Sequence, residues 1–399
     1  MNAVQQPAAV SQDRPIGAKS IRIYLLSLLF YTASHILLVL LPLNANALGA
    51  SPSQIGLIMG AYMFTSMFLR PVAGRIVDKF GTSRVFTTVL VLHVAVLSLY
   101  LIRELWVFAL LRMAQGVILS FFSMVAHLMI IEALPDKSRG QGLSLFSLSS
   151  MLPYTYGPFL ALYFADRVPM PYLFAALIPV GLATLLIGLT VKPPERPAAD
   201  RPPEGSVYGG ETYRWWKDRK LIFPSVIMLL ASAIIGTVAS FLPLYLEKRG
   251  LPYAGLYFMT ETAVLVTVRF FGRKFVPTDG RFPAGTAAVL LVLMTAAVML
   301  IRSADSLPIL LTAAVCNGLA LSMLYPTLVT YVSFIVPERF RGRGIGLFIA
   351  AADFGTSVGT WALSLVADAY SYHAMFAGCI WIGAAALLIL LGSKKRGVA

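Results

Sequence analysis

The chain has 399 residues, of which 58% are hydrophobic and 13% charged, with a mean hydropathy of +0.78. Soluble domains usually carry about 25% charged residues, so this composition excludes an ordinary cytosolic enzyme and a disordered chain. It also excludes a nucleic-acid-binding protein despite the formal net charge of +14, because the distribution of the basic residues matters more than their sum.

Apolar runs predict an all-α membrane protein with twelve membrane-spanning helices. The predicted spans cover residues 21–43, 53–77, 84–102, 105–131, 142–165, 170–191, 221–246, 254–276, 283–301, 306–335, 343–367 and 372–392. The expected organisation is a cytoplasmic N-terminal tail (1–20), an N-terminal six-helix bundle (21–191), a cytoplasmic linker (192–220), a C-terminal six-helix bundle (221–392) and a cytoplasmic C-terminal tail (393–399).

The basic residues predict the orientation of these spans. With the amino terminus placed inside, 24 of the 32 Lys and Arg residues fall in inner segments, 5 in outer loops and 3 within spans. Cytoplasmic loops carry an excess of Lys and Arg, so both termini are expected in the cytoplasm.

The connection after the second span carries a charged motif, Gly74-Arg75-Ile76-Val77-Asp78-Lys79-Phe80-Gly81-Thr82-Ser83-Arg84. It resembles the G-x-x-x-D-[RK]-x-G-[RK]-[RK] signature of the major facilitator superfamily, and with the twelve spans the resemblance covers nearly the whole chain. The resemblance implies two six-helix bundles that rock about a central cavity. It also implies a cytoplasmic latch formed by Gly74, Arg75, Asp78, Lys79, Gly81, Arg84 and Glu132, in which Asp78 accepts hydrogen bonds at the start of a helix near Gly344. The alternative is a solvated basic turn that serves only topology.

The fourth span contains Arg112-Met113-Ala114-Gln115-Gly116, which resembles the R-x-x-[QG]-G pattern of the same superfamily. A buried guanidinium stays charged, so it requires an acid, a carbonyl or an anionic substrate. The resemblance implies that Arg112 takes part in substrate binding and in proton coupling. The alternative is an arginine that snorkels to the outer membrane boundary, which Trp106 marks.

The fifth span contains Gly157-Pro158, which resembles the Gly-Pro pair of the antiporter motif G-x-x-x-G-P-x-x-G-G found in exporters of the superfamily. Pro158 removes one backbone hydrogen bond and bends the helix, and Gly157 lets a neighbouring helix approach closely. Pro153, Leu160 and Ala161 depart from the motif. The pair therefore favours an exporter over an importer without completing the signature.

Three of the four histidines lie well inside predicted spans, namely His35, His93 and His127. The resemblance places His35 and His127, like Arg112, on helices that line the central cavity. It places His93 on an outermost helix, where a structural role is expected.

Two acids lie well inside spans, Glu261 in the eighth and Asp353 in the eleventh. A carboxyl group that is buried without a firm partner exchanges protons readily, so both are candidate proton carriers. The alternative is fixed pairing within the bundle, with Arg269 as one partner for Glu261.

The two halves of the chain repeat each other. Residues 135–142 match residues 337–344 at an offset of 202, and at the same offset Gln115-Gly116 falls on Asn317-Gly318. One offset that recurs across two motifs indicates an internal duplication.

Spans two and eight repeat at an offset of 199, where Gly56 falls on Gly255 and Arg70 falls on Arg269. Parallel repeats with a site between the halves are one known construction of transporters.

The cavity helices also carry polar aromatic and amide side chains that suit an amphipathic organic molecule. The candidate substrate-binding residues are His35, Arg112, Gln115, His127, Tyr154, Tyr156, Asn317 and Tyr325. The sequence has no phosphate-binding loop, metal-ligand spacing or catalytic arrangement. We therefore expect a monomeric transporter, not an enzyme, without cofactor or bound metal, that acts on a small molecule, protons and the lipid bilayer.

Residues 22–27 and 60–68 resemble exporters of staphylopine-type opine metallophores from Gram-positive bacteria. The first and fourth spans carry His35, Arg112 and His127 and no acid in mid-span, which favours a substrate with several carboxylates. The expected function is proton-driven export of a small anionic organic molecule across the bacterial cytoplasmic membrane. Broad multidrug efflux and metabolite import are the alternatives.

Overall fold

A computed structural model describes residues 17–134, 136–191, 218–272, 281–336 and 341–395, and in these residues every regular element is a helix. The helices of the first half are α1 (Ala18–Ala47), α2 (Pro52–Phe80), α3 (Thr82–Leu99), α4 (Leu105–Ala133), α5 (Asp136–Ala165), α6 (Met170–Ala175) and α7 (Leu177–Thr190). Those of the second half are α8 (Arg219–Lys248), α9 (Ala254–Gly272), α10 (Ala284–Ser303), α11 (Leu307–Ile335), α12 (Arg341–Phe354), the π-helix η5 (Gly355–Gly359), α13 (Thr360–Ala369) and α14 (Tyr372–Lys395).

These helices give the twelve predicted spans, because α6 and α7 follow each other as the sixth and α12, η5 and α13 form the eleventh. Nine spans among the described residues are long and apolar enough to cross a membrane by length and composition alone. The other three are α2, α5 and α9, which contain residues outside the described side chains, and each of them carries charged or polar groups. Polar groups in spans are costly in lipid, so they are expected to face the interior of the bundle.

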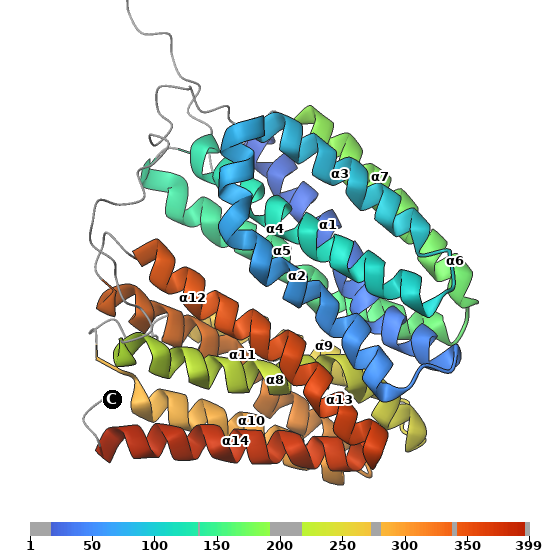
Figure 1. Ribbon diagram of the computed structural model, residues 1–399, viewed down its shortest axis with the longest axis vertical. Helices are drawn as coiled ribbons and strands as arrows, with labels where there is room; N and C mark the ends of the chain where they lie inside the picture. The colour runs from blue at the N-terminus through green and yellow to red at the C-terminus, as the bar shows by residue number, and fades with distance from the viewer. Residues whose placement is uncertain (1–16, 135, 192–217, 273–280, 337–340, 396–399) are drawn as a thin grey trace, which may run out of the picture.

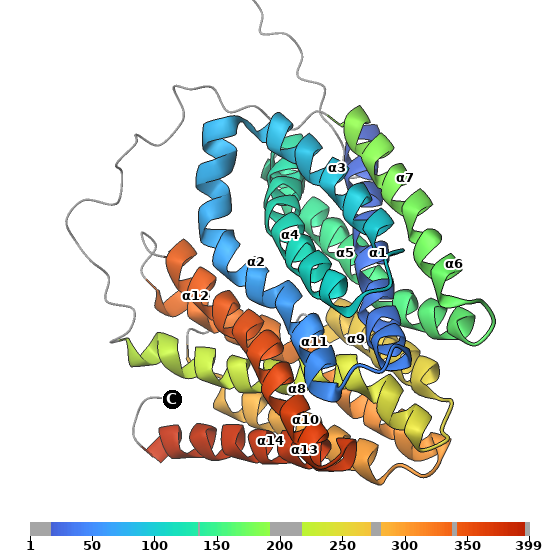
Figure 2. The ribbon, with the colours of Figure 1, turned by 45° about the vertical axis from the view of Figure 1, so that its right-hand side comes forward.

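The helices run side by side in two bundles, with the first half above the second in Figure 1. Helix α3 and the α6–α7 pair lie at the outer edge of the first bundle, and α10 and α14 lie at the outer edge of the second, in both views (Figures 1 and 2). The principal contacts between the halves are made by α1, α2 and α5 with α8, α9 and the α12–α13 span. The interface between the halves is therefore formed by these helices.

Local sequence signals set both ends of α2. Ser51 and Gln54 form a capping box, in which the Ser51 hydroxyl accepts a hydrogen bond from the backbone N–H of Gln54 and the Gln54 side-chain oxygen accepts one from the backbone N–H of Ser51. The helix ends at Gly81, whose φ of 86° lies in the left-handed region that favours glycine. The chain can therefore reverse at once into α3.

Equivalent glycines bring equivalent helices into close contact in the two halves. A Cβ on Gly116 of α4 would lie 2.3 Å from the backbone oxygen of Tyr62, and a Cβ on Gly318 of α11 would lie 2.4 Å from that of Glu261. Gly318 is the duplicate of Gly116 at offset 202, and Glu261 is the duplicate of Tyr62 at offset 199. The same backbone contact thus recurs at the positions that the repeat relates.

Glycines also admit the contacts around η5. A Cβ on Gly355 would lie 2.1 Å from the backbone oxygen of Leu229 in α8, and one on Gly60 of α2 would lie 2.7 Å from that of Ser357. The π-helical turn is therefore packed tightly between α8 of its own half and α2 of the other half, and single π turns of this kind occur mostly at functional sites.

Candidate functional site

A central cavity of about 510 Å³ lies between the two halves. Its walls come from α1, α2, α4 and α5 on one side and from α8, α11, α12, η5 and α13 on the other. Its polar lining consists of Tyr31, Ser34, His35, Tyr62, Arg70, Arg112, Ser123, His127, Tyr154, Ser240, Tyr325, Thr356 and Thr360. This size and mixed lining suit a small amphipathic organic molecule.

The two walls of the cavity differ in charge. The first half contributes Arg70 and Arg112 together with His35 and His127, whereas the second half contributes hydroxyl and aliphatic groups. No Asp or Glu is among the described lining residues. Because Arg70 pairs with Asp353, the unpaired positive charge in the described lining is the guanidinium of Arg112.

Arg112 is fully buried and has no acidic partner among the described residues. Its guanidinium donates to Gln115 Oε1 at 3.2 Å and contacts Met59 Sδ at 3.6 Å, and it lies 4.9 Å from the centre of the Tyr62 ring. Nε has no hydrogen-bond partner. The head group is thus buried inside the bundle and held by neutral groups.

The two cavity histidines are held in different ways. His35 packs against Tyr31 and Tyr154 through ring contacts at 6.1 and 5.1 Å. His127 Nδ1 lies 2.6 Å from the Ser123 carbonyl oxygen. Because a carbonyl only accepts, Nδ1 carries the hydrogen, and Nε2 remains available to a ligand.

Glu261 is buried behind the cavity wall, where it is held by neutral donors. Asn317 Nδ2 and the Tyr257 hydroxyl both donate to Glu261 Oε1, the latter at 3.3 Å. Arg269, considered above as a partner on the same helix, donates instead to the Ser322 carbonyl and contacts Met151. Among the described residues, Glu261 therefore has no cationic partner.

Asp353 forms an ion pair across the two halves. Its Oδ2 lies 3.5 Å from Arg70 Nη2, and this is the salt bridge found among the described residues. Arg70 also donates to Ser66 Oγ from Nε at 3.3 Å. The sequence indicated only that Arg70 is a charged residue within a span, which needs a partner because an unpaired charge is costly in lipid. The identity of that partner depends on how the two halves dock.

The structure separates the predicted binding residues into two groups. His35, Arg112, His127, Tyr154 and Tyr325 line the cavity. Three others are not among its lining residues: Gln115 accepts from Tyr100, Tyr156 shares a hydrogen bond with Thr32, and Asn317 holds Glu261. These three lie behind the wall and position other groups.

His93, for which a structural role was expected, is buried on α3 and stacks at 4.6 Å on Phe30 of α1, away from the cavity lining. Pro153 and Pro158 both lie inside the continuous helix α5. A Cβ on Gly157 would lie 3.1 Å from His35 Cβ, so this glycine lets α1 and α5 approach beside the cavity.

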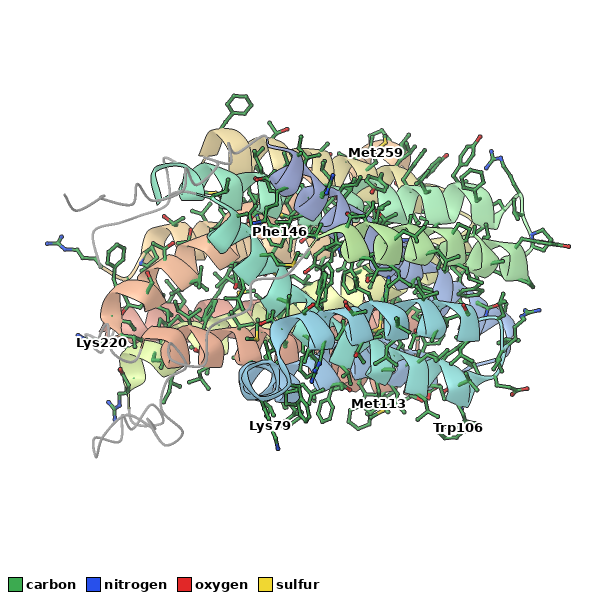
Figure 3. All side chains as sticks on the ribbon, turned by 90° about the horizontal axis from the view of Figure 1, so that it is seen from above. Lys79, Trp106, Met113, Phe146, Lys220 and Met259 are labelled. Atoms are coloured by element: carbon green, nitrogen blue, oxygen red, sulfur yellow. The ribbon has the colours of Figure 1, made fainter. Side chains whose placement is uncertain are left out.

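The predicted latch falls largely outside the described side chains, which omit those of Gly74, Arg75, Asp78 and Glu132. Lys79 and Arg84 are exposed, and Lys79, which extends away from the ribbon in Figure 3, lies 5.5 Å from the centre of the Phe80 ring. The latch stays a prediction.

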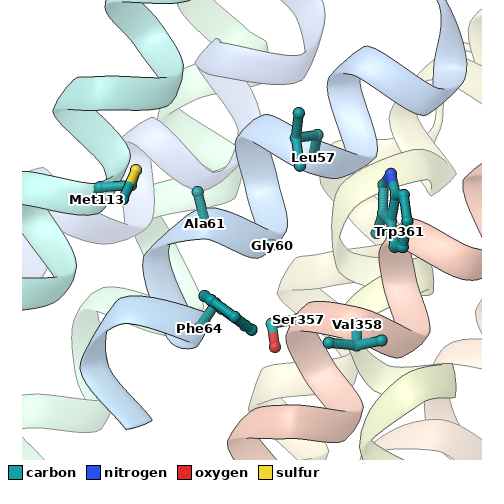
Figure 4. Close-up of a pocket in the computed structure, with 8 residues that line it drawn as sticks. All are labelled: Leu57, Gly60, Ala61, Phe64, Met113, Ser357, Val358 and Trp361. Carbon is teal, nitrogen blue, oxygen red and sulfur yellow. The ribbon is translucent and has the colours of Figure 1, made fainter. Parts of the chain in front are cut away.

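Two other cavities differ from the central one in chemistry. A cavity of about 530 Å³ at the far ends of α1, α5 and α8 includes the acids Asp166 and Glu247. A groove of about 330 Å³ lies where α2 meets η5 and α13 (Figure 4). It is lined by Leu57, Gly60, Ala61, Phe64, Met113, Ser357, Val358 and Trp361, and we call it the seam groove.

Among the described residues no group of three or more His, Cys, Asp or Glu side chains could hold a metal ion. The polar groups that line the central cavity are arginine, histidine and hydroxyl side chains.

Comparison with known proteins agrees with this architecture. A model of the Major Facilitator Superfamily matches residues 23–306 and 280–397. The chain is 34% identical to the staphylopine export protein of Staphylococcus aureus (strain Mu50 / ATCC 700699), over 90% of this chain and 92% of that protein. It is 24% identical to multidrug resistance protein 1 of Bacillus subtilis (strain 168), over 80% of this chain and 82% of that one.

Solved structures resemble the whole chain at low sequence identity. A nucleoside transporter, NupG, superposes with a TM-score of 0.75 at 14% identity, covering 95% of this chain and 98% of that one. A D-xylose-proton symporter superposes with a TM-score of 0.73 at 17% identity, covering 93% and 95%. At these identities the likeness shows the fold.

Proposed function

The chain belongs to the Major Facilitator Superfamily, and from this premise we propose that it is a proton-driven exporter of a small anionic organic molecule of the opine-metallophore class. That it is a multi-pass membrane transporter and not an enzyme follows from the family. The direction of transport, the proton coupling and the substrate are the proposal.

The observation that carries the proposal is the buried guanidinium of Arg112 in a cavity whose described lining has no acid. An opposite-charge pair at ~4 Å is worth about 4 kcal/mol at an effective dielectric constant of about 20, before desolvation costs. The guanidinium therefore stabilises a carboxylate in this cavity and destabilises a cation by a similar interaction free energy. Opine metallophores carry several carboxylates together with amines, and the similarity to the staphylopine export protein supports this class.

The proton is assigned to Glu261. Its carboxyl group is fully buried, and its partners Asn317 and Tyr257 are neutral donors that tolerate either protonation state better than a fixed cation would. Asp353 has a cationic partner in Arg70 and is assigned to the contact between the halves. In this scheme the two candidate acids have separate tasks.

Rocking of the two halves would expose the cavity alternately to the two sides of the membrane. The contacts that must open and close are those of α2 with the α12–α13 span and of α5 with α9. Both run along the cavity, so binding there can bias the equilibrium between the two states.

Broad multidrug efflux is the second candidate, because the chain is also similar to multidrug resistance protein 1 of Bacillus subtilis over most of its length. A pump for lipophilic cations generally places an acid in its cavity. The acid-free lining of the described cavity therefore favours the anionic substrate.

Uptake into inside-out membrane vesicles tests the proposal. Vesicles that contain the chain should accumulate a staphylopine-type opine, and a protonophore should abolish the accumulation. Vesicles that carry the Arg112→Ala variant are the matched control. Uptake of the opine only by right-side-out vesicles would make the protein an importer, and accumulation of ethidium without the opine would make it a multidrug pump.

A comparison of metabolites in a strain that lacks the gene with its parent identifies the natural substrate. The deletion strain should retain one polycarboxylate compound in its cells. Retention of a lipophilic cation instead would overturn the proposed substrate class.

A further inference from the structure

The internal duplication relates two arginine contacts between the halves, and their partners differ. Arg70 of α2 and Arg269 of α9 are duplicates at offset 199, and Met151 of α5 and Asp353 of α12 are duplicates at offset 202. Arg70 contacts Asp353 across the α2–α12 interface, and Arg269 Nη1 contacts Met151 Sδ at 2.7 Å across the α5–α9 interface. The two contacts occupy equivalent places in the molecule.

The duplicate contact on α5 and α9 lacks its acid. A thioether is a weak acceptor, and the other partner of Arg269 is the neutral carbonyl of Ser322 at 3.2 Å. Among the described residues the salt bridge is that of Arg70, so Arg269 has no anionic partner there. An unpaired cation within a membrane span is expensive, and such residues face a functional path by default.

Arg269 lies next to the central cavity. Its two contacts, Met151 and Ser322, are each three residues from a cavity-lining tyrosine, Tyr154 on α5 and Tyr325 on α11. Residues three apart share a helix face. A carboxylate bound in the cavity beside Tyr154 and Tyr325 is therefore close to Arg269, which has no anionic partner among the described residues.

We propose that Arg269 binds a carboxylate of the substrate, which supplies at the α5–α9 contact the anion that Asp353 supplies at the α2–α12 contact. This inference rests on the proposed anionic substrate and deepens it. A substrate with at least two anionic groups can occupy Arg112 and Arg269 together. Binding then supplies the anionic partner that the second of two equivalent cross-half contacts lacks, which a neutral analogue cannot do.

Binding of a staphylopine-type opine to the purified chain in detergent, followed by calorimetry, tests this role. Arg269→Gln removes the cation, and Met151→Asp supplies the missing acid within the protein, so that Arg269 is already neutralised. Loss of a buried charge partner typically costs several factors of ten in affinity, and each variant should weaken opine binding about tenfold or more. Met151→Leu and Met151→Asn are the matched controls for volume and polarity, and both should bind like the original chain.

A double variant separates this role from packing. Once Met151→Asp is present, adding Arg269→Gln should lower affinity little further, because both changes remove the same interaction. The thermal midpoint of Met151→Asp should not fall below that of Met151→Leu, since it adds an ion pair.

Three outcomes would overturn the inference. If Arg112→Ala weakens opine binding but Arg269→Gln and Met151→Asp do not, the inference fails and the proposed function stands. If Met151→Leu weakens binding as much as Met151→Asp, the site is a packing contact. If the original chain binds no polycarboxylate, the proposed substrate class and this inference fail together.

Discussion

Arg112 is the residue whose substitution separates anion binding from general packing. Arg112→Ala should abolish export of a polycarboxylate, because the cavity loses a buried guanidinium that is held by neutral groups. Arg112→Lys should keep only part of the activity, since lysine loses the two-pronged hydrogen-bonding geometry. Opine accumulation in inside-out vesicles measures both. Full activity of Arg112→Lys, or ethidium export that survives Arg112→Ala, would contradict the anion-selective cavity.

Glu261 is the residue whose substitution tests proton coupling. Glu261→Gln keeps the size of the side chain and a hydrogen-bonding oxygen for Asn317 but cannot release a proton. Opine efflux driven by a proton gradient should fall to background, while exchange of labelled for unlabelled opine across the same membrane should continue. Asp353→Asn is the matched control: as a member of the Arg70 pair it should reduce both modes. Gradient-driven efflux by Glu261→Gln would place the proton elsewhere.

For individual residues, the sequence predicted which side chains face the cavity better than it predicted which side chains contact each other. His35, Arg112 and His127 line it as expected. The contacts of Glu261 with Asn317 and of Asp353 with Arg70 could not be predicted from the sequence, because the partners belong to other spans. The repeat relates Asp353 to Met151 and Arg70 to Arg269, but it does not predict the contact between Asp353 and Arg70, since that contact depends on how the two halves dock.

Among the helices, the duplicated glycines predict matched effects on stability. Gly116→Ala and Gly318→Ala each place a Cβ less than 3 Å from a backbone oxygen of the neighbouring helix, which cannot yield as a side chain would. Overpacking of this kind costs roughly 1–3 kcal/mol. Both variants should therefore lower the thermal midpoint of unfolding in detergent.

The control is Gly285→Ala, because a Cβ there meets nothing within 4 Å. It should leave the midpoint unchanged or raise it slightly, as alanine is favoured over glycine within a helix. If Gly116→Ala and Gly285→Ala behave alike, the close backbone approach is not a source of stability.

The helices themselves were predictable because lipid imposes a simple length rule. Predicted span 105–131 became α4, Leu105–Ala133, and predicted span 372–392 became α14, Tyr372–Lys395. The π-helical turn Gly355–Gly359 was not predicted. Hydropathy reports where a helix runs but not a local change in its hydrogen-bond pattern.

For the whole molecule, the proposed rocking predicts that a covalent link across the halves stops transport. Ser53 at the start of α2 donates to Asp368 near the end of α13. The pair Ser53→Cys with Asp368→Cys, in a chain with Cys316→Ala and Cys379→Ala, should cross-link on oxidation and lose export. A reductant should restore it, and each single cysteine variant should stay active. Full export by the cross-linked chain would show that these helix ends need not separate.

The seam groove of Figure 4 has a consequence for the surrounding bilayer. One wall of the groove is formed by α2 of the first half, and the other by η5 and α13 of the second half. Leu57, Phe64 and Trp361 are exposed in the groove. If the halves rock, the width of the groove changes, so an acyl chain that enters this apolar groove would be displaced in one state and admitted in the other. Fatty-acid length and unsaturation would then change the free-energy difference between the two states of the transporter. Turnover would respond to the fluidity of the host membrane without any change at the binding cavity.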